Sequence, residues 1–312
     1  MRWRELVGAV GRLEPGERNA ITDVPGVRVG HAQAASGQRT GVTVVEPPAL
    51  PAPAGVAVVN GVGELTAKLE IDERGVMETP VYLCGSHAVG TVFQAAVLAS
   101  GRGPDNVVLP VVGECDDGDM ADSRTVSIGD VDAALEALGT DVAEGSVGAG
   151  TGMICFDFPG GIGTASRVVG EHRVGVLLLC NFGDRDYLDV PVELPPLTGP
   201  PSAPGSCIAV CVTDAPLSAQ QLRRLALRPL LGLARVGSYG AEGSGEIGLA
   251  FTTSTAQDLP TDRLDPYFAA AYEAAHEAVL NCLVAARPAR RLDGTMQEGF
   301  PVDALAELFA KE

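Results

Sequence analysis

Residues 190–217 read VPVELPPLTGPPSAPG followed by SCIAVCVTDAPL, and the two parts meet at Gly205 and Ser206. Six prolines lie between Pro191 and Pro204, so neither a helix nor a central strand can run through the first part. In the second part, apolar side chains alternate with smaller ones, which is typical of a buried strand. The stretch therefore predicts a loop that ends on glycine and enters a strand on a hydroxyl residue.

A Gly-Ser pair at such a boundary is a place where a chain can cut itself. The serine hydroxyl attacks the carbonyl carbon of Gly205, an ester forms, and water then releases a new α-amine on Ser206. Because an α-amine titrates at about 7.7–8.0, it can serve as the base for the hydroxyl of its own residue. On motif frequency alone, the same dipeptide indicates an ordinary solvated loop.

The overall composition favours a soluble, cytoplasmic protein. The chain has 312 residues, of which 46% are hydrophobic, and a formal net charge of −18 at pH 7. This acidity argues against nucleic acid as a partner, because phosphate binding needs a basic face. No apolar run is long enough to span a membrane, and Glu5 interrupts the short apolar run near the start. We therefore expect neither a membrane segment nor a secretion signal.

Metal, cofactor and histidine-based chemistry find no support in the sequence. The seven cysteines form no C-x-x-C pair, and the four histidines form neither HExxH nor His-x-His. No Gly-x-Ser-x-Gly elbow accompanies a histidine partner. We therefore expect buried, reduced thiols, no metal site and no cofactor. A serine enzyme built on this sequence would work without histidine.

Strand and helix patterns alternate along the chain and predict an α/β layered domain. We expect Asp130 to cap the N-terminus of a short helix and Gly139 to end it. Strands are expected within residues 21–32, 40–48, 55–62, 106–114, 163–172, 173–184, 206–213 and 237–254. Helices are expected at 86–100, 130–138, 218–235, 265–286 and 301–311, and the last of them should cover a face of a mixed sheet.

Two further places could carry chemistry alongside the serine. GSGEIG (243–248) puts Ser244 and Glu246 two residues apart at the mouth of a strand, so both side chains share one face and could polarise an amine or hydroxyl. Asn181 ends the apolar run VGVLLLC, where its amide could donate to an oxyanion. A polar turn explains Ser244 and Glu246 equally simply, and an asparagine at a strand exit often only starts a turn.

A third feature is the acidic segment GECDDGDMAD (113–122). Its five carboxylates could bind Ca²⁺ or Mg²⁺, but the spacing is not that of an EF-hand loop. A solvated acidic turn or a rim that recognises cations fits this segment better. The glycine-rich EGSVGAGTGM (144–153) lacks the dinucleotide-binding spacing, although its amides could line a small pocket.

Taken together, these segments resemble the DmpA-type family of self-processing aminopeptidases, which includes L-aminopeptidase/D-esterase and β-peptidyl aminopeptidase enzymes. The resemblance covers most of the chain in a shared order, with NAITDVPGVRVGH (19–31), VVNGVGELTA (58–67), EGSVGAGTGMICFDFPGGIGTASRVV (144–169), LLLCNFGD (177–184) and GSGEIGLAFTTS (243–254) among its segments. It implies a four-layer αββα sandwich of the DmpA/ornithine-acetyltransferase type. It also implies cleavage before Ser206 into an α chain (1–205) and a β chain (206–312) that together form one domain and assemble into homo-oligomers.

Carried over residue by residue, the resemblance implies a role for each matching position. Ser206 resembles the nucleophile, and Ser244 and Glu246 match the polar pair that contacts its new amine. Asn181 matches the asparagine that helps to form the oxyanion hole. Glu114 resembles the acid that receives the substrate's free amino group, and Asn60 falls in a substrate-binding segment.

The chain departs from the family pattern at CDDGDMAD (115–122), where members carry something like TYDGYLND. Asp116 and Asp119 replace aromatics, and an ionised carboxylate cannot donate a hydrogen bond, so another donor must complete the oxyanion hole. Gly85 also stands where the family pattern has asparagine. We expect Asp116 and Asp119 to join Glu114 in substrate binding and to favour substrates that are cationic or have a free amine.

The sequence therefore predicts a self-processing N-terminal-serine hydrolase that removes N-terminal residues from small peptides, amides or esters. Three alternatives stay open. One is a linear-amide hydrolase of the nylon-oligomer type, and another is an acyltransferase like ornithine acetyltransferase, which usually has threonine at the cut. The third is a non-catalytic, cation-binding relic, which the aspartates in place of aromatics would suit.

Overall fold

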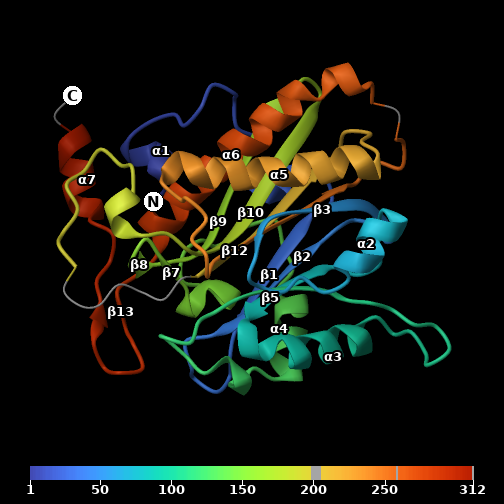
Figure 1. Ribbon diagram of the computed structural model, residues 1–312, viewed down its shortest axis with the longest axis horizontal. Helices are drawn as coiled ribbons and strands as arrows, with labels where there is room; N and C mark the ends of the chain where they lie inside the picture. The colour runs from blue at the N-terminus through green and yellow to red at the C-terminus, as the bar shows by residue number, and fades with distance from the viewer. Residues whose placement is uncertain (198–204, 258, 311–312) are drawn as a thin grey trace.

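Two β-sheets lie face to face in the computed structural model, which describes residues 1–197, 205–257 and 259–310 (Figure 1). The larger sheet has the strand order β4, β3, β12, β11, β10, β9, with the bounds Val76–Met77, Ala52–Gly61, Gly245–Thr252, Ser206–Thr213, His172–Asn181 and Gly161–Val169. The smaller sheet has the order β1, β2, β5, β6, with the bounds Arg28–Gln33, Gly41–Glu46, Val81–Gly85 and Val111–Cys115.

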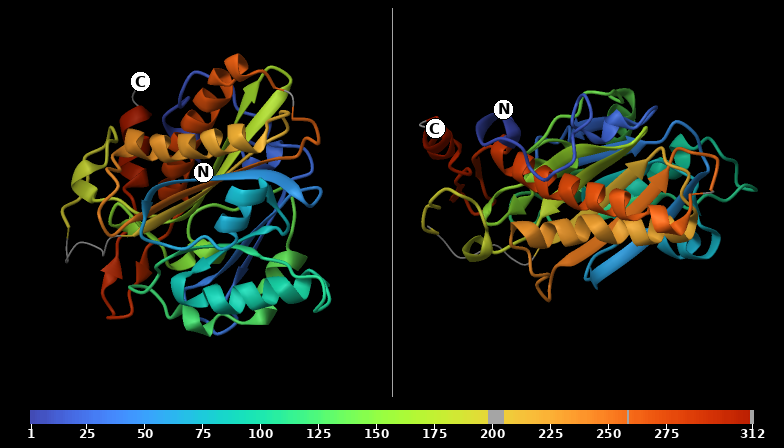
Figure 2. Two further views of the ribbon diagram at one scale, coloured as in Figure 1. Left: turned by 45° about the vertical axis from the view of Figure 1, so that its right-hand side comes forward. Right: turned by 90° about the horizontal axis from the view of Figure 1, so that it is seen from above.

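Helices cover the outer face of each sheet, so the molecule has four layers (Figures 1 and 2). Helices α5 (Ala219–Val236) and α6 (Asp265–Ala285) run side by side over the larger sheet. Helices α3 (Val89–Ala99) and α4 (Ile128–Glu136) pack on the smaller sheet. The predicted four-layer α/β sandwich is confirmed by this arrangement.

Shorter elements complete the fold at its margins. They are the helices α1 (Trp3–Leu6), α2 (Lys68–Arg74) and α7 (Val302–Phe309), and the small strands β7 (Ile154–Cys155), β8 (Phe158–Pro159), β13 (Ala289–Arg290) and β14 (Met296–Gln297). Single 3₁₀ turns occur at Ile21–Asp23, Ser86–Ala88, Ser123–Thr125, Gly148–Gly152, Arg185–Tyr187 and Thr261–Arg263. Within the residues that the structure describes, no helix is both long and apolar enough to cross a membrane.

Strand alternation divides the core into layers. Along β11, Ile208 and Val210 pack between the two sheets, whereas Cys207 and Ala209 pack against the helices of the outer layer. A third cluster lies between the smaller sheet and helices α3 and α4. All of β11 is buried, because it lies inside the larger sheet with both faces covered.

Glycines set how closely the outer helices approach the larger sheet. A Cβ on Gly248 of β12 would lie 2.2 Å from the backbone oxygen of Ala226 in α5. A Cβ on Gly163 of β9 would lie 2.0 Å from the backbone oxygen of Ala278 in α6. Both distances are too short for any side chain, so these positions require glycine for the helices to pack as they do.

Most of the predicted elements are present, with two corrections. Helix α4 is capped by Ser127, whose hydroxyl pairs with the Asp130 carboxylate at 2.9 Å, so Asp130 is the third helical residue and not the cap. The helix ends at Glu136, before Gly139. Strand β5 was not among the predicted strands, and the prolines at 200, 201 and 204 lie outside the described residues.

Candidate active site

Four neighbouring strands of the larger sheet place polar residues at one end of that sheet. Asn181 is the last residue of β10 and pairs in register with Ser206, the first residue of β11. In the next strand, Glu246 pairs with Cys207 on one side and with Asn60 of β3 on the other. Residues more than 180 positions apart, such as Asn60 and Glu246, therefore lie in adjacent strands beside the predicted cleavage point.

Gly205 and Ser206 are both buried at this end of the sheet. Ser206 is 6% exposed. A Cβ on Gly205 would lie 1.6 Å from the backbone oxygen of Asn181 and 2.8 Å from its side-chain Nδ2. Only glycine fits there, and the residue whose carbonyl is the predicted target of Ser206 therefore lies against an amide donor.

The Asn181 side chain is held in one orientation by two backbone partners. Its Oδ1 accepts a hydrogen bond from the Ile154 amide at 2.8 Å, and its Nδ2 donates to the Asp116 carbonyl at 2.8 Å. Because Oδ1 is occupied by a donor, Nδ2 is the group turned toward Asp116 and Gly205. The sequence indicated Asn181 but gave no sign of Ile154, whose contribution is a backbone N–H.

Ser244, which directly precedes β12, and Glu246, within β12, form a buried pair beside Ser206. The Ser244 hydroxyl donates to Glu246 Oε1, and the two residues are each 3% exposed. Glu246 Oε2 is buried and has no hydrogen-bond partner among the described residues. Burial raises the pKa of Glu246, although the hydrogen bond from Ser244 opposes this. A buried carboxylate oxygen without a donor is costly, and it is well suited to receive a positive group.

Glu114 reaches the same region from the opposite sheet. It lies in β6, is 6% exposed, and its Oε1 accepts a hydrogen bond from the Glu64 amide at 2.8 Å. Its Oε2 accepts a hydrogen bond from the Ser86 hydroxyl. None of the ion pairs formed by the described residues includes Glu114, so only neutral donors hold this carboxylate. Ser86 was not predicted, although it directly follows Gly85, where the chain departs from the family pattern.

Asp116 and Asp119 lie at the exposed rim of this region. The Asp116 carboxylate accepts a hydrogen bond from the Gly118 amide at 2.9 Å, while its backbone carbonyl binds Asn181. The Asp119 carboxylate pairs with Arg291 at 3.5 Å, and its carbonyl accepts from the Leu292 amide at 3.0 Å. The hairpin of β13 and β14 is thereby joined to the acidic segment.

Asn60 points its amide at the backbone of a neighbouring loop. Its Nδ2 donates to the carbonyls of Ala241 and Glu242 at 2.9 and 3.0 Å. This loop leads directly into Ser244, so the structure gives Asn60 a contact that positions the Ser244–Glu246 pair. No group of three or more potential metal ligands is arranged to hold an ion in the described part of the chain.

Comparison with known proteins identifies the family. The model of peptidase family S58 matches residues 19–297. A β-peptidyl aminopeptidase, BapA of Sphingosinicella microcystinivorans, is 38% identical over 96% of this chain and 89% of its own length. BapA of Sphingosinicella xenopeptidilytica is 37% identical over 94% of this chain and 87% of its own length.

Two solved structures share the whole fold. A β-aminopeptidase from a Burkholderia species has a TM-score of 0.89 at 38% identity, covering 100% of this chain and 99% of that one. An L-aminopeptidase D-Ala-esterase/amidase from Ochrobactrum anthropi, described as a variant of the Ntn hydrolase fold, has a TM-score of 0.86 at 30% identity and covers 99% and 98% of the two chains. The predicted resemblance is therefore confirmed, and the chain belongs to peptidase family S58.

Proposed function

We propose that this protein cuts itself between Gly205 and Ser206 and then removes N-terminal residues from small peptides, amides or esters. The observation that carries the proposal is the buried Glu246 Oε2, which has no hydrogen-bond partner among the described residues and lies in the strand beside Ser206. A processed chain would supply the missing donor, because cleavage creates an ammonium group on the first residue of β11. The likeness to aminopeptidases of the same fold supports this reading.

In the processing step, Ser206 Oγ attacks the carbonyl carbon of Gly205. The Gly205–Ser206 C–N bond breaks as the C–O bond forms, so the acyl group moves from nitrogen to oxygen and the Ser206 nitrogen gains a proton. Water then hydrolyses the ester, which leaves a carboxylate on Gly205 and a free amine on Ser206. The contact between Gly205 and Asn181 supports a role for the amide in stabilising the oxyanion of this step.

In the catalytic step, the Ser206 α-amine accepts the proton of its own hydroxyl as Oγ attacks the substrate carbonyl. Glu246 and Ser244 hold that amine and stabilise it once protonated. Asn181 Nδ2 and a backbone N–H hold the oxyanion, for which Nδ2 exchanges its bond to the Asp116 carbonyl. The protonated amine then gives its proton to the leaving group as the bond between that group and the substrate's acyl carbon breaks, which leaves the acyl group as an ester on Oγ. Water, deprotonated by the same amine, hydrolyses this ester, releases the N-terminal residue and restores the Ser206 hydroxyl.

Glu114 is proposed to hold the substrate's ammonium group. Its carboxylate is buried and held by neutral donors alone, so a substrate cation would complete its surroundings. This arrangement favours substrates with a free amino terminus over N-acetylated ones. It also favours aminopeptidase activity over the other reactions considered, because neither simple amide hydrolysis nor acetyl transfer requires a buried anion beside the acyl carbon. Asp116 and Asp119 are proposed to extend the acidic rim.

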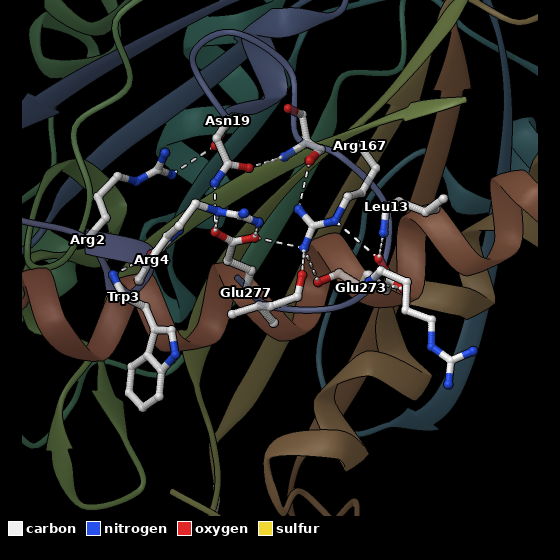
Figure 3. Close-up of polar contacts among 12 residues, drawn as sticks. Arg2, Trp3, Arg4, Leu13, Asn19, Arg167, Glu273 and Glu277 are labelled. Atoms are coloured by element: carbon white, nitrogen blue, oxygen red, sulfur yellow. Dashed lines mark hydrogen bonds and ion pairs between the residues drawn. The ribbon is translucent and has the colours of Figure 1, made fainter. Parts of the chain in front are cut away.

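The two chains produced by cleavage, 1–205 and 206–312, are proposed to stay together as one domain. Strands β11 and β12 lie between β10 and β3, so the second chain would occupy the middle of a sheet formed by the first. A buried ionic network also crosses the division (Figure 3). In it, Arg4 and Arg167 from the first part contact Glu277 from the second at 2.9 and 2.7 Å.

A cytoplasmic location and homo-oligomeric assembly are also proposed. All seven cysteines are buried and none forms a disulfide, which suits a reducing compartment. At the end of β3 and just after it, Val59 and Val62 are 56% and 49% exposed. Neighbouring apolar side chains at a sheet margin support contact with another copy of the chain.

Intact mass spectrometry of the purified wild type and Ser206→Ala tests the proposal. Two fragments with masses that place the cut before Ser206 are expected from the wild type, and one uncut chain is expected from the variant. Wild-type protein should release p-nitroaniline from amino acid p-nitroanilides and leave the N-acetylated compounds intact. A wild type that is active as one unbroken polypeptide contradicts the proposal, as does equal turnover of the free and acetylated substrates.

A further inference from the structure

An apolar groove lies beside Glu114, at the end of the larger sheet. Its volume is about 540 Å³, within the usual range of about 300–1,000 Å³ for small-molecule pockets. Its apolar lining comes from Val58, Leu65, Leu69, Leu109 and Ile247, that is, from β3, α2, β12 and the segments next to them. The residues proposed to act on the substrate's acyl group, Ser206, Asn181 and Glu246, do not line this groove.

Three charged side chains line the groove, Glu64, Lys68 and Glu70. The Oε2 atom of Glu70 is buried and has no hydrogen-bond partner among the described residues. Lys68 is paired with Asp72, and Glu70 is paired with Arg74 at 2.7 Å. These pairs lie along α2, with both partners one helical turn apart. The groove therefore has a mainly apolar surface, and its one lysine is already paired with Asp72, so it suits an apolar group better than an anionic one.

Gly63 connects this groove to the proposed ammonium site. A Cβ on Gly63 would lie 3.3 Å from Glu114 Oε1, 3.7 Å from Ile247 Cδ1 and 3.8 Å from the Cα of Gly245. Gly245 is the first residue of β12, and Ser206 is the first residue of the parallel strand β11 beside it. Gly63 thus lies between the carboxylate that holds the substrate amine, the groove, and the strand next to the nucleophile.

We propose that the groove accepts the apolar side chain of the substrate's N-terminal residue, and that Gly63 determines the size of side chain admitted. The inference rests on the proposed function, which fixes that residue at two points, its ammonium group at Glu114 and its carbonyl carbon at Ser206. The Cα lies between these two points, so the side chain leaves the substrate beside Gly63. Leucine and phenylalanine are the kind of residue that this surface would bind.

Gly63→Ala tests the inference with the smallest possible change. The backbone of Gly63 is outside the left-handed region, and the closest atom to the new Cβ is the end of a side chain, so the variant should fold. We expect the ratio of kcat/KM for leucine p-nitroanilide to that for glycine p-nitroanilide to fall by about 10-fold or more, since one methyl group in an apolar pocket changes discrimination by about 10–200-fold. Gly63→Val should lower the ratio further.

Gly90→Ala provides the matched control, because a Cβ at this exposed position in α3 has no neighbour within 4 Å. It should leave the leucine-to-glycine ratio as it is in the wild type. An equal loss for both substrates in Gly63→Ala would mean that the methyl group only disturbs Glu114, and would overturn the assignment of the groove. An unchanged ratio would overturn it as well.

A second variant distinguishes this inference from two other outcomes, namely that the groove binds another copy of the chain or that the proposed function is wrong. Leu69 is 83% exposed at the groove, and Leu69→Lys should lower the leucine-to-glycine ratio while leaving the molar mass in light scattering unchanged. A lower mass with unchanged selectivity would show that the groove binds another copy of the chain. A wild type that is uncut, or that turns over neither substrate, would refute the proposed function itself. If the wild type is processed and active but substitutions of Gly63 and Leu69 leave the leucine-to-glycine ratio unchanged, only the assignment of the groove is refuted.

Discussion

Two buried glutamates, Glu277 and Glu246, differ in how many partners their carboxylate oxygens have. Both oxygens of Glu277 in α6 are engaged: Oε1 accepts from Arg4 and Asn19 at 3.0 and 2.7 Å, and Oε2 pairs with Arg4 and Arg167 at 2.9 and 2.7 Å (Figure 3). Glu246 in β12 has a hydrogen bond from Ser244 on one oxygen, while the other has no partner among the described residues.

The pKa values of the two carboxyl groups shift in opposite directions. Burial would raise the pKa of Glu277, but the hydrogen bond from Arg4 and the charges of Arg167 and Arg4 outweigh it and lower that pKa. For Glu246, burial prevails and raises the pKa. The carboxylate of Glu277 is therefore fully paired and serves the fold, whereas one oxygen of Glu246 could still pair with a cation. In our proposal that cation is the ammonium group of Ser206.

The largest expected effect is the loss of activity in Glu246→Gln. Gln keeps the shape of the side chain and removes the charge that would hold the Ser206 amine, so kcat should fall by about 10²–10⁴-fold, the usual contribution of proton transfer. Activity on amino acid p-nitroanilides, together with intact mass to follow processing, measures it. Glu242→Gln in the exposed part of the same loop is the control and should behave as the wild type. Full activity in Glu246→Gln would show that the charge of Glu246 is not needed for catalysis, and would contradict the contrast drawn with Glu277.

Glu277→Gln should instead lower stability. The change leaves Arg167, whose side chain is fully buried, without its closest carboxylate, and breaking a buried ion pair costs about 3–5 kcal/mol of unfolding free energy. Urea unfolding measures the loss. Glu273→Gln is the graded control, because Glu273 pairs with the same arginine at 3.4 Å but is 12% exposed and should cost less. Equal losses in the two variants would show that burial does not determine the strength of this network.

The sequence indicates the candidate active site better than it indicates the ionic network around Glu277, for a physical reason. Ser206, Asn181, Ser244 and Glu246 stand at strand ends, where local patterns of apolar residues and glycine show the boundary between strand and turn. Arg4 and Glu277 are 273 positions apart, and nothing near either one indicates the other. Likewise, Ser127 and Asp130 are both good helix caps, and only the final backbone path decides which of them caps α4.

The resemblance to a known family supplied what local patterns could not. It predicted that Glu114, in the smaller sheet, acts at the same site as Ser206, in the larger one, although no periodicity links the two strands. It did not indicate that Asn60 would contact the loop before Ser244, or that Asp119 would pair with Arg291. Such contacts depend on the conformation of loops, which the sequence of the loops alone specifies only weakly.

Asn181→Asp examines the oxyanion site with a smaller expected effect. Aspartate can still accept the hydrogen bond from the Ile154 amide, but it cannot donate to the Asp116 carbonyl or to an oxyanion. Loss of one such donor lowers kcat by about 10²–10³-fold, and KM should change less. Asn106→Asp, in an exposed loop, introduces the same charge and serves as the control. A rise in KM with kcat unchanged would assign Asn181 to substrate binding.

The smallest effect concerns Glu246 before processing, studied in Ser206→Ala so that no ammonium group forms. A pKa raised in the folded state means that stability is greatest below the unfolded value of about 4.3 and falls as the pH rises through the folded pKa. Adding Glu246→Gln should therefore raise the melting temperature at pH 7, by on the order of 2 °C, and the gain should vanish near pH 4.

In the processed wild type, where the ammonium group would pair with Glu246, the same substitution should lower the melting temperature. The same sign in both backgrounds would mean that no charge arrives at Glu246 on cleavage.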